Sequence, residues 1–188
     1  YQSDITVDLQ TNTVEIHKNR TEDWKVTVVD TGMYSETGLR IAQIEKYIQD
    51  DTFIVTYGDC LSDINMNEML AYHKEHGRMA TMAVARPTGR NAAVEISPEG
   101  YLLRGSEASG NDQAWINACL YVFNRKVFSI LNGNYNLNRL LKEKIADKEQ
   151  LVTYKHRGFW APVETHHDRF NMENLWNAGV APWLKAEK

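Results

Sequence analysis

The chain has 188 residues, of which 43% are hydrophobic and 24% charged, and its formal net charge is −4 at pH 7. This composition is typical of a folded globular domain and excludes a chain that is disordered throughout. No basic stripe favours contact with a nucleic-acid backbone, and no apolar run approaches the roughly 20 residues that span a bilayer. We therefore expect one domain over residues 1–188 of a cytoplasmic protein, with no nucleic-acid or membrane partner.

The first part of the chain predicts a two-stranded ribbon, another strand, a helix and a buried strand. Apolar and polar residues alternate over residues 5–9 and 13–17, on either side of a tight turn. Residues 25–29 form a β-branched run, and apolar residues recur at helical spacing over 41–48. The continuous apolar run over 53–57 is typical of a central strand that is buried on both faces.

A helix and a second buried strand follow. Asn65 is placed to cap the helix at its N-terminus, and Gly77 is placed to end it. The apolar run over 79–85 predicts the strand. With the strand over 53–57, this order gives a βαβ unit, whose crossover is expected to be right-handed.

The last part of the chain predicts shorter strands and two helices. Over residues 92–123 turn-forming segments separate short apolar runs, which predicts antiparallel pairing. Helical spacing over 137–146 and 169–178 flanks a strand over 151–156. The fold class is therefore α/β, with a mixed, mostly parallel sheet flanked by helices and an antiparallel subregion.

An acidic side chain follows the predicted strand over 53–57. Asp59 comes after Tyr57 and Gly58, where open α/β sheets bind their ligands, and the glycine leaves room for a phosphate or a metal ion. An aspartate that only forms a turn is an equally good interpretation. Glu164 follows a later strand, and if the two strand ends are neighbours, both carboxylates could hold one divalent cation.

Histidine, arginine and cysteine residues offer weaker candidates. Adjacent histidines point in different directions on a helix or strand, so a surface or capping role is favoured over metal binding. Three arginines could contact phosphate, but an arginine without a known partner is more often solvated. The two cysteines lack metal-type spacing and are expected to be small buried residues. These residues are His166, His167, Arg86, Arg90, Arg104, Cys60 and Cys119.

A set of short motifs runs through the chain in a fixed order. The motifs are Glu22-Asp23-Trp24-Lys25-Val26-Thr27, Thr37-Gly38 with Arg40, Thr56-Tyr57-Gly58-Asp59, His73-Lys74, Trp115-Ile116-Asn117, Gly158-Phe159-Trp160 and Ala181-Pro182-Trp183. As a set and in this order, they resemble the motifs of the glucose-1-phosphate cytidylyltransferase family. The resemblance covers nearly the whole chain.

The resemblance implies a Rossmann-like nucleotidyltransferase fold with an antiparallel acceptor side. It also implies transfer of CMP from CTP to a phosphorylated small acceptor, glucose 1-phosphate in the family, with release of pyrophosphate. The family's Tyr-Gly-Asp aspartate binds the catalytic Mg²⁺, which assigns this role to Asp59, and Glu164 stands where the family has a second acidic ligand. A homo-oligomer is compatible with the resemblance. Substrate contacts are assigned to Arg40, Tyr57, Gly58, Trp115 and Asn117.

The chain also departs from the family's pattern. The family's Gly-rich nucleotide loop is expected upstream of Tyr1, so we expect an N-terminally truncated domain that is inactive by itself. The family's sugar-phosphate lysine falls near residues 106–109, where no lysine occurs, and a family glycine is Ala92. The family's Asn-Gly-Gly of the acceptor pocket is Asn117-Ala118-Cys119. Two other functions therefore stay open: a cytidylyltransferase for a non-hexose acceptor such as a phosphorylated amino-acid amide, and a non-catalytic binding domain.

Overall fold

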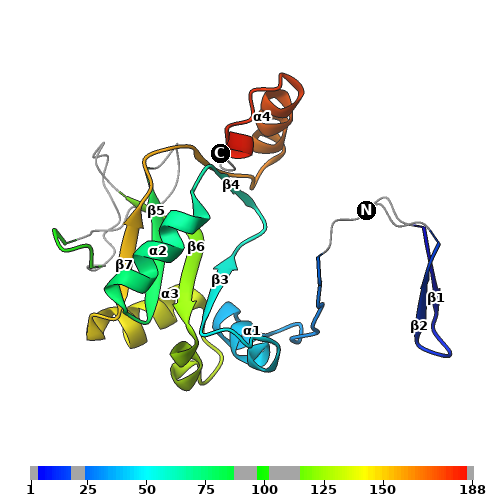
Figure 1. Ribbon diagram of the computed structural model, residues 1–188, viewed down its shortest axis with the longest axis horizontal. Helices are drawn as coiled ribbons and strands as arrows, with labels where there is room; N and C mark the ends of the chain where they lie inside the picture. The colour runs from blue at the N-terminus through cyan, green and yellow to red at the C-terminus, as the bar shows by residue number, and fades with distance from the viewer. Residues whose placement is uncertain (1–3, 18–23, 87–96, 102–114, 186–188) are drawn as a thin grey trace. The chain divides into compact units, whose positions relative to one another are not determined.

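A computed structural model describes residues 4–17, 24–86, 97–101 and 115–185, and the chain divides into two compact units, residues 1–30 and 31–188. The first unit holds a β-ribbon, and the second holds a mixed sheet with its helices (Figure 1). Every candidate site residue belongs to the second unit. One domain over the whole chain stays a prediction.

The ribbon of the first unit forms as its alternating pattern predicts. Strands β1 (Ile5–Asp8) and β2 (Thr13–Ile16) pair antiparallel. The Asp8 carboxylate fixes the turn, because it accepts hydrogen bonds from the backbone N–H groups of residues 10 and 11 at 2.8 and 3.1 Å. The strand expected over 25–29 is wrong, since those residues lie in neither helix nor strand. Their β-branched side chains favour extended backbone but supply no pairing partner.

The sheet of the second unit is mixed. In the described part of the chain it has the order β3-β6-β5-β7, formed by β3 (Thr52–Thr56), β6 (Ile116–Asn124), β5 (Ala80–Ala85) and β7 (Leu151–Lys155). Strand β6 is antiparallel to both of its neighbours, whereas β5 and β7 are parallel. Strands β3, β5 and β7 therefore run in one direction and β6 in the other, which confirms a mixed sheet.

Two details of this sheet differ from expectation. Strand β6 separates β3 from β5, so the two strands of the predicted βαβ unit are not neighbours. Strand β3 lies at an edge of the described sheet rather than at its centre, and Ile54 within it is 39% exposed. A β-branched apolar run is as typical of an edge strand with one covered face as of a central strand, and sequence cannot separate the two.

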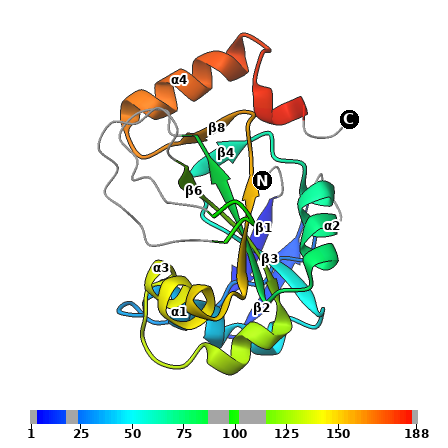
Figure 2. The same ribbon diagram turned by 90° about the vertical axis from the view of Figure 1, so that its left-hand side faces the viewer.

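Helices cover both faces of the sheet (Figure 2). Helix α2 (Met66–His76) begins and ends as predicted: the Asn65 side chain accepts from two backbone N–H groups, and Gly77 closes the helix with a φ of 63°. The opposite face carries α1 (Thr37–Gln43) and α3 (Leu137–Leu140). The remaining turns are η1 (Glu45–Tyr47), η2 (Arg125–Ile130), the π-helical η3 (Leu141–Ile145) that continues α3, and η4 (Ala146–Lys148).

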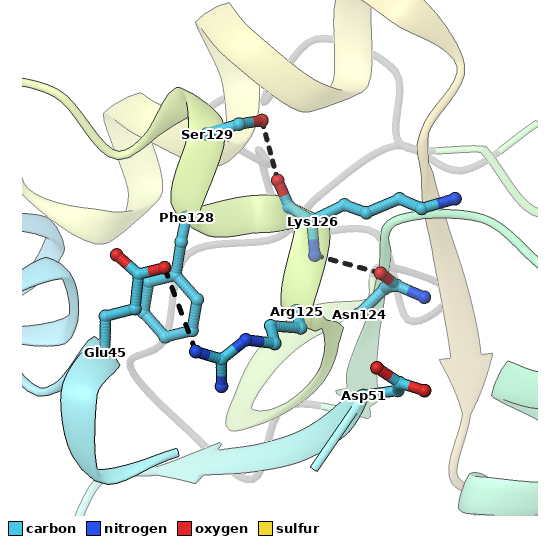
Figure 3. Close-up of a pocket in the computed structure, with 7 residues that line it drawn as sticks. All are labelled: Glu45, Asp51, Asn124, Arg125, Lys126, Phe128 and Ser129. Carbon is cyan, nitrogen blue, oxygen red and sulfur yellow. Dashed lines mark hydrogen bonds and ion pairs between the residues drawn. The ribbon is translucent and has the colours of Figure 1, made fainter. Parts of the chain in front are cut away.

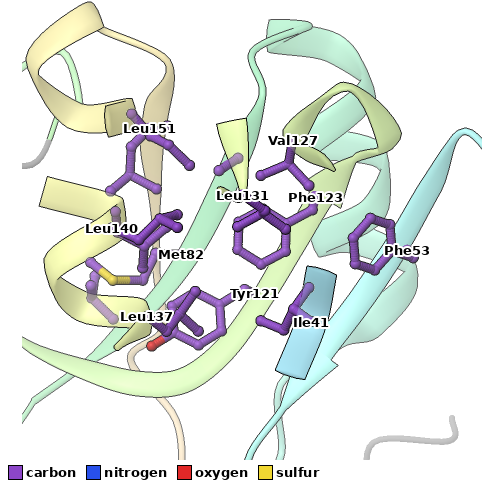
Figure 4. Packing of buried hydrophobic residues seen from close by; sticks show 14 residues of the cluster. Ile41, Phe53, Met82, Tyr121, Phe123, Val127, Leu131, Leu137, Leu140 and Leu151 are labelled. Atoms are coloured by element: carbon purple, nitrogen blue, oxygen red, sulfur yellow. The ribbon is translucent and has the colours of Figure 1, made fainter. Parts of the chain in front are cut away.

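The hydrophobic core has two parts because the side chains of β5 alternate between the two faces of the sheet. Met82 and Val84 pack with Tyr121, α1 and α3 in the larger part (Figure 4), whereas Ala83 and Ala85 pack beneath α2. Each fully buried large apolar side chain stabilises the fold by about 1.5–3 kcal/mol relative to an exposed one. These two layers hold the sheet and its strand ends in place.

A second, small sheet extends the fold beyond β3. Strand β4 (Cys60–Ser62) pairs antiparallel with β8 (Trp160–Pro162), and α4 (His166–Asn177) and η5 (Pro182–Lys185) follow. The Trp160 indole N–H donates to the carbonyl oxygen of Ala118 at 2.9 Å, which fastens this sheet to β6. Helix α4 begins three residues earlier than expected, because Thr165 and Asp168 form a capping box.

A buried polar cluster joins α2 to β5. The Thr81 hydroxyl lies 2.8 Å from Nδ1 of His73 and 2.7 Å from Nε2 of His76. His73 is only 3% exposed, and burial together with the neighbouring His76 lowers its pKa to about 4. The folded protein therefore keeps His73 neutral at a pH where the unfolded chain takes up a proton.

We expect the free energy of unfolding to fall as the pH drops from about 6.5 towards 4, by up to ~1.4 kcal/mol per pH unit for this one group. Well above pH 6.5 His73 is neutral in both the folded and the unfolded protein, so its contribution is complete there. Urea denaturation between pH 4.5 and 7.5 measures the slope. His73→Gln should make the dependence of stability on pH less steep, whereas His167→Gln, the control at an exposed site, should not. An unchanged slope in His73→Gln would contradict the lowered pKa of His73.

Candidate functional site

A cavity of about 340 Å³ opens at the carboxyl end of β3. In mixed α/β sheets this end of the strands is where ligands bind. Its walls come from β4, β6, β8 and α3, together with the residues that follow β3 and β8. The lining residues are Tyr57, Asp59, Cys60, Ile116, Asn117, Cys119, Tyr121, Asn138, Trp160, Pro162 and Glu164.

The two predicted carboxylates meet in this cavity. Asp59 lies between β3 and β4, and Glu164 follows β8. The pairing of β4 with β8 brings them together, and the backbone N–H of Val163 donates to the carbonyl oxygen of Asp59 at 2.7 Å. Both carboxylates are exposed, and within the described ranges neither forms an ion pair with a cationic side chain. Their oxygens are therefore available to a ligand.

A bulge in β6 shapes the wall opposite the carboxylates. The register with β5 shifts between Met82, which pairs with Tyr121, and Val84, which pairs with Asn117. Within this bulge Cys119 has a φ of 59°, a left-handed conformation that costs a non-glycine residue about 1–2 kcal/mol. Its carbonyl oxygen accepts from the Tyr57 N–H at 3.1 Å. The bulge thus ties β6 to the residue that precedes Gly58 and Asp59.

The bulge also aims polar groups into the cavity. The Asn117 side chain accepts from the Cys119 N–H at 2.9 Å and donates to the Tyr121 hydroxyl and, at 3.1 Å, to Oδ1 of Asn138. Burial raises the pKa of Tyr121, and burial likewise raises the pKa of Tyr57, so both phenols stay protonated near neutral pH. The wall therefore offers neutral hydrogen-bonding groups opposite two negative charges.

Both cysteines line the cavity, whereas they were expected to be small buried residues. Each is half-buried rather than buried, and neither forms a disulfide within the described chain. The Cys60 thiol lies 3.7 Å from Oδ1 of Asp59. The neighbouring Cys119 thiol raises the pKa of Cys60, and burial acts in the same direction. No spacing pattern in the sequence predicts this, because the two residues meet only through the pairing of distant strands.

The other predicted substrate-binding residues lie outside this cavity. Arg40 donates to the Thr31 hydroxyl at 2.6 Å and to the carbonyl oxygen of Met33 at 3.4 Å, so it holds the turn before α1. A Cβ at Gly58 would meet no atom within 4 Å, which leaves open space beside Asp59. Trp115 precedes β6 and does not line the cavity. Substrate contacts by all three stay predictions.

Several weaker candidates are also placed. His166 and His167 are exposed in the first turn of α4, as expected for surface residues. Arg86 is exposed directly after β5. Arg90, Arg104, Ala92 and residues 106–109 lie outside the described residues. Sequence reasoning missed Asn138 and Tyr121, since only the fold brings α3 beneath β6.

A larger cavity of about 630 Å³ lies at the opposite edge of the sheet, before β3 and after β6 (Figure 3). It is lined by cationic and acidic side chains, and Arg125 lies 4.0 Å from the Glu45 carboxylate. This is the amino edge of β3, β5 and β7, away from the edge where α/β sheets bind ligands.

No helix in the described ranges is long and apolar enough to cross a membrane.

Comparison with known proteins gives concordant matches. Residues 4–177 match a family described as nucleotidyl transferase. The chain is 35% identical over 187 residues to the glucose-1-phosphate cytidylyltransferase of Salmonella typhi, covering 97% of this chain and 72% of that protein. It is 31% identical over 181 residues to the probable glucose-1-phosphate cytidylyltransferase of Bacillus subtilis (strain 168), covering 95% of this chain and 70% of that protein.

Solved structures show the same fold. HddC from Yersinia pseudotuberculosis superposes with a TM-score of 0.59 at 15% identity, covering 72% of this chain and 60% of that chain. The inositol-1-phosphate CTP transferase from T. maritima gives a TM-score of 0.57 at 14% identity, covering 72% and 58%. The chain therefore spans less than two thirds of each of these solved chains. The likeness confirms a mixed sheet flanked by helices in a Rossmann-like arrangement.

Replacement of Cys119 by glycine should leave the fold as stable as before or stabilise it by up to ~1 kcal/mol. The substitution removes the left-handed strain, which the added chain entropy of glycine partly offsets. Ala118→Gly is the matched control, because Ala118 has a negative φ and should lose about 0.5–1 kcal/mol. Urea denaturation measures both, and a clear loss of stability in Cys119→Gly would contradict the strain assigned here.

Proposed function

This chain belongs to the nucleotidyl transferase family, and from that premise we propose that it carries the metal-binding and acceptor side of a cytidylyltransferase. The enzyme would join CMP from CTP to a phosphorylated small acceptor and release pyrophosphate. The observation that supports this most is the cavity in which Asp59 and Glu164 face the polar wall of β6. The two Salmonella and Bacillus relatives, which are named as cytidylyltransferases, support CTP as the donor.

The donor set of the cavity fits Mg²⁺. Mg²⁺ prefers oxygen ligands and is usually bound through one or two carboxylates, with substrate phosphates and water completing its shell. Asp59 and Glu164 supply two carboxylates from adjoining strand ends, and within the described ranges no third acidic, histidine or cysteine ligand joins them in a metal-type cluster. When bound, the ion would neutralise charge on the phosphates. Asp59 and Glu164 would hold it.

The proposed reaction is an in-line displacement at phosphorus. An oxygen of the acceptor phosphate forms a bond to the α-phosphorus of CTP, while the bond from that phosphorus to the oxygen bridging to the β-phosphate breaks. The bond electrons leave with pyrophosphate, so no covalent enzyme intermediate is needed. The protein contributes positioning and electrostatic stabilisation. Rigid support of the cavity by the β6 bulge and the β4–β8 pair serves that role.

The polar wall gives the acceptor a defined orientation. Asn117 is held by Tyr121 and Asn138, so its amide is fixed rather than free to rotate. Tyr57 and Tyr121 are neutral at neutral pH like any phenol, and burial raises the pKa of both further. Neutral donors and acceptors of this kind suit hydroxyl or amide groups on the acceptor. The Cys119 side chain, which stands where the resembling family has glycine, narrows this wall and favours a different acceptor from glucose 1-phosphate.

Removal of one carboxylate should greatly lower turnover without unfolding the protein. In the native protein, Asp59→Asn and Glu164→Gln should each lower kcat by about two to three orders of magnitude, the usual cost of losing a group that stabilises transition-state charge. Pyrophosphate release with CTP and a panel of phosphorylated acceptors measures this. Asp51→Asn, at the other end of β3, is the matched control and should keep activity. Wild-type turnover in Asp59→Asn would contradict the proposal.

Glucose 1-phosphate should be a poor acceptor. We expect kcat/KM below ~10⁴ M⁻¹s⁻¹, the lower end of the usual range for enzymes. Cys119→Gly should raise kcat/KM for glucose 1-phosphate while leaving KM for CTP unchanged, because the thiol narrows only the acceptor wall. Steady-state kinetics of both proteins provide the measurement. Efficient use of glucose 1-phosphate by the native protein would show that the thiol leaves the hexose enough room.

A further inference from the structure

Two arginines and a tryptophan come together beside the cavity, at the ends of three adjoining strands. Arg86 directly follows β5, Arg157 follows β7 by two residues, and Trp115 directly precedes β6. The pairings of Ala85 with Ile116 and of Val84 with Lys155 place these three ends at one edge of the sheet. This is the same edge at which Asp59 follows β3.

The two guanidinium groups share one aromatic ring. The guanidinium carbon of Arg86 lies 5.9 Å from the centroid of the Trp115 ring, and that of Arg157 lies 5.6 Å from it. Both distances are within the range of cation–π attraction. Both arginines are exposed, and neither forms an ion pair or a hydrogen bond with a carboxylate in the part of the chain that the structure describes. Trp115 thus contacts two like charges, whose N–H donors have no acidic partner among the residues that the structure describes.

The turn that carries Arg157 is rigidly built. His156 is only 9% exposed, and its Nε2 lies 2.7 Å from the Asp63 carboxylate and 3.0 Å from the carbonyl oxygen of Phe159. The backbone N–H of His156 donates to the carbonyl oxygen of Val84 at 2.8 Å. A Cβ at Gly158 would lie 2.8 Å from Cε1 of His156, and closer still to Asp63, so a larger residue there would have to displace this pair of side chains. Arg157 therefore projects to solvent from a fixed backbone.

Electrostatics show what such a pair is suited to bind. A phosphate dianion is repelled by Asp59 and Glu164, and charge-assisted bonds from planar guanidinium groups offset that repulsion best, because their paired donors match two phosphate oxygens. The chain has a net charge of −4, so two neighbouring exposed cations that lack acidic partners in the described ranges are a local exception to its overall charge. In addition, no lysine occurs over residues 106–109, where the resembling family holds the acceptor phosphate.

We infer that Arg86 and Arg157, spaced by Trp115, form the binding site for the phosphate group of the acceptor. This inference rests on the proposed function, because it names a subsite of the same reaction. CTP carries phosphate as well, but the contiguous segment Trp115-Ile116-Asn117 links the arginine pair to the Asn117 wall that faces the acceptor. The acceptor's phosphomonoester therefore occupies the arginine pair while the rest of the acceptor extends along the Asn117 wall.

Kinetics of the native protein separate the two sources of phosphate. Arg86→Gln and Arg157→Gln should each raise KM for the acceptor about ten- to hundredfold, the effect of losing one charged hydrogen bond. KM for CTP should stay within about twofold. The acceptor KM of Arg157→Lys should lie between those of the native protein and Arg157→Gln, since lysine keeps the charge but not the planar guanidinium group. Lys155→Gln removes another exposed cation from the end of β7 and is the matched control, expected to change neither KM. A rise in KM for CTP alone would overturn the acceptor assignment.

Direct binding gives a readout that does not depend on turnover. The NMR signal of the Trp115 indole N–H is identified as the one that Trp115→Phe removes. It should shift when inorganic phosphate or glucose 1-phosphate is added to the native protein. It should not shift with glucose or with chloride at equal ionic strength. The shift should vanish in the double variant Arg86→Gln/Arg157→Gln. Phosphate binding that depends on both arginines in a protein without transferase activity would support the site and refute the proposed function. Normal turnover with unchanged phosphate binding and acceptor KM in the double variant would refute the site alone.

Discussion

The arrangement of the candidate site depends on one constraint, the antiparallel insertion of β6 between β3 and β5. A straight strand in this position would continue its pairing with β5 without interruption, but β6 bulges at Cys119 and shifts its register between Met82 and Val84. The bulge offers its carbonyl oxygens outward, to the Tyr57 N–H and the Trp160 indole. Both β3 and the β4–β8 sheet are thereby fixed to one irregular segment, as is typical of bulges next to functional sites.

Charge is distributed along the carboxyl edge of the sheet in a regular way. Negative charge gathers where β3 and β8 end, at Asp59 and Glu164, whereas positive charge gathers where β5 and β7 end, at Arg86 and Arg157. The neutral side chains of the β6 segment lie between them, because β6 separates β3 from β5. A substrate with a metal-binding end and a free phosphate end is suited to span these two regions. The free phosphate meets the positive charge of the arginines, and the other end meets a cation that the carboxylates would hold.

The sequence alone predicts the parts of this site that depend on local signals. Asn65 and Gly77 mark the ends of α2 because capping chemistry acts over a few residues, and Asp59 is recognisable because it directly follows an apolar strand. The bulge at Cys119 and the meeting of Arg86 with Arg157 could not be predicted, because both arise from pairing between strands far apart in the chain. The strand predicted over 25–29 is absent for a similar reason, because β-propensity without a pairing partner does not make a strand.

Two departures from the resembling family have one physical explanation under the proposed function. Cys119 adds a side chain to the wall that faces the acceptor, which leaves less room beside Asn117 for a hexose. The absence of lysine over 106–109 removes the cation that would hold the acceptor phosphate there, and the arginine pair supplies two cations at the ends of β5 and β7 instead. A phosphate held at that pair places the rest of the acceptor along the Asn117 wall, where the Cys119 side chain limits its size. Both changes are explained together if the acceptor differs from the hexose phosphate and its phosphate lies at the arginine pair. The exposed carboxylates in the cavity and the two exposed arginines, which have no acidic partner in the described part of the chain, are the groups on which that explanation depends.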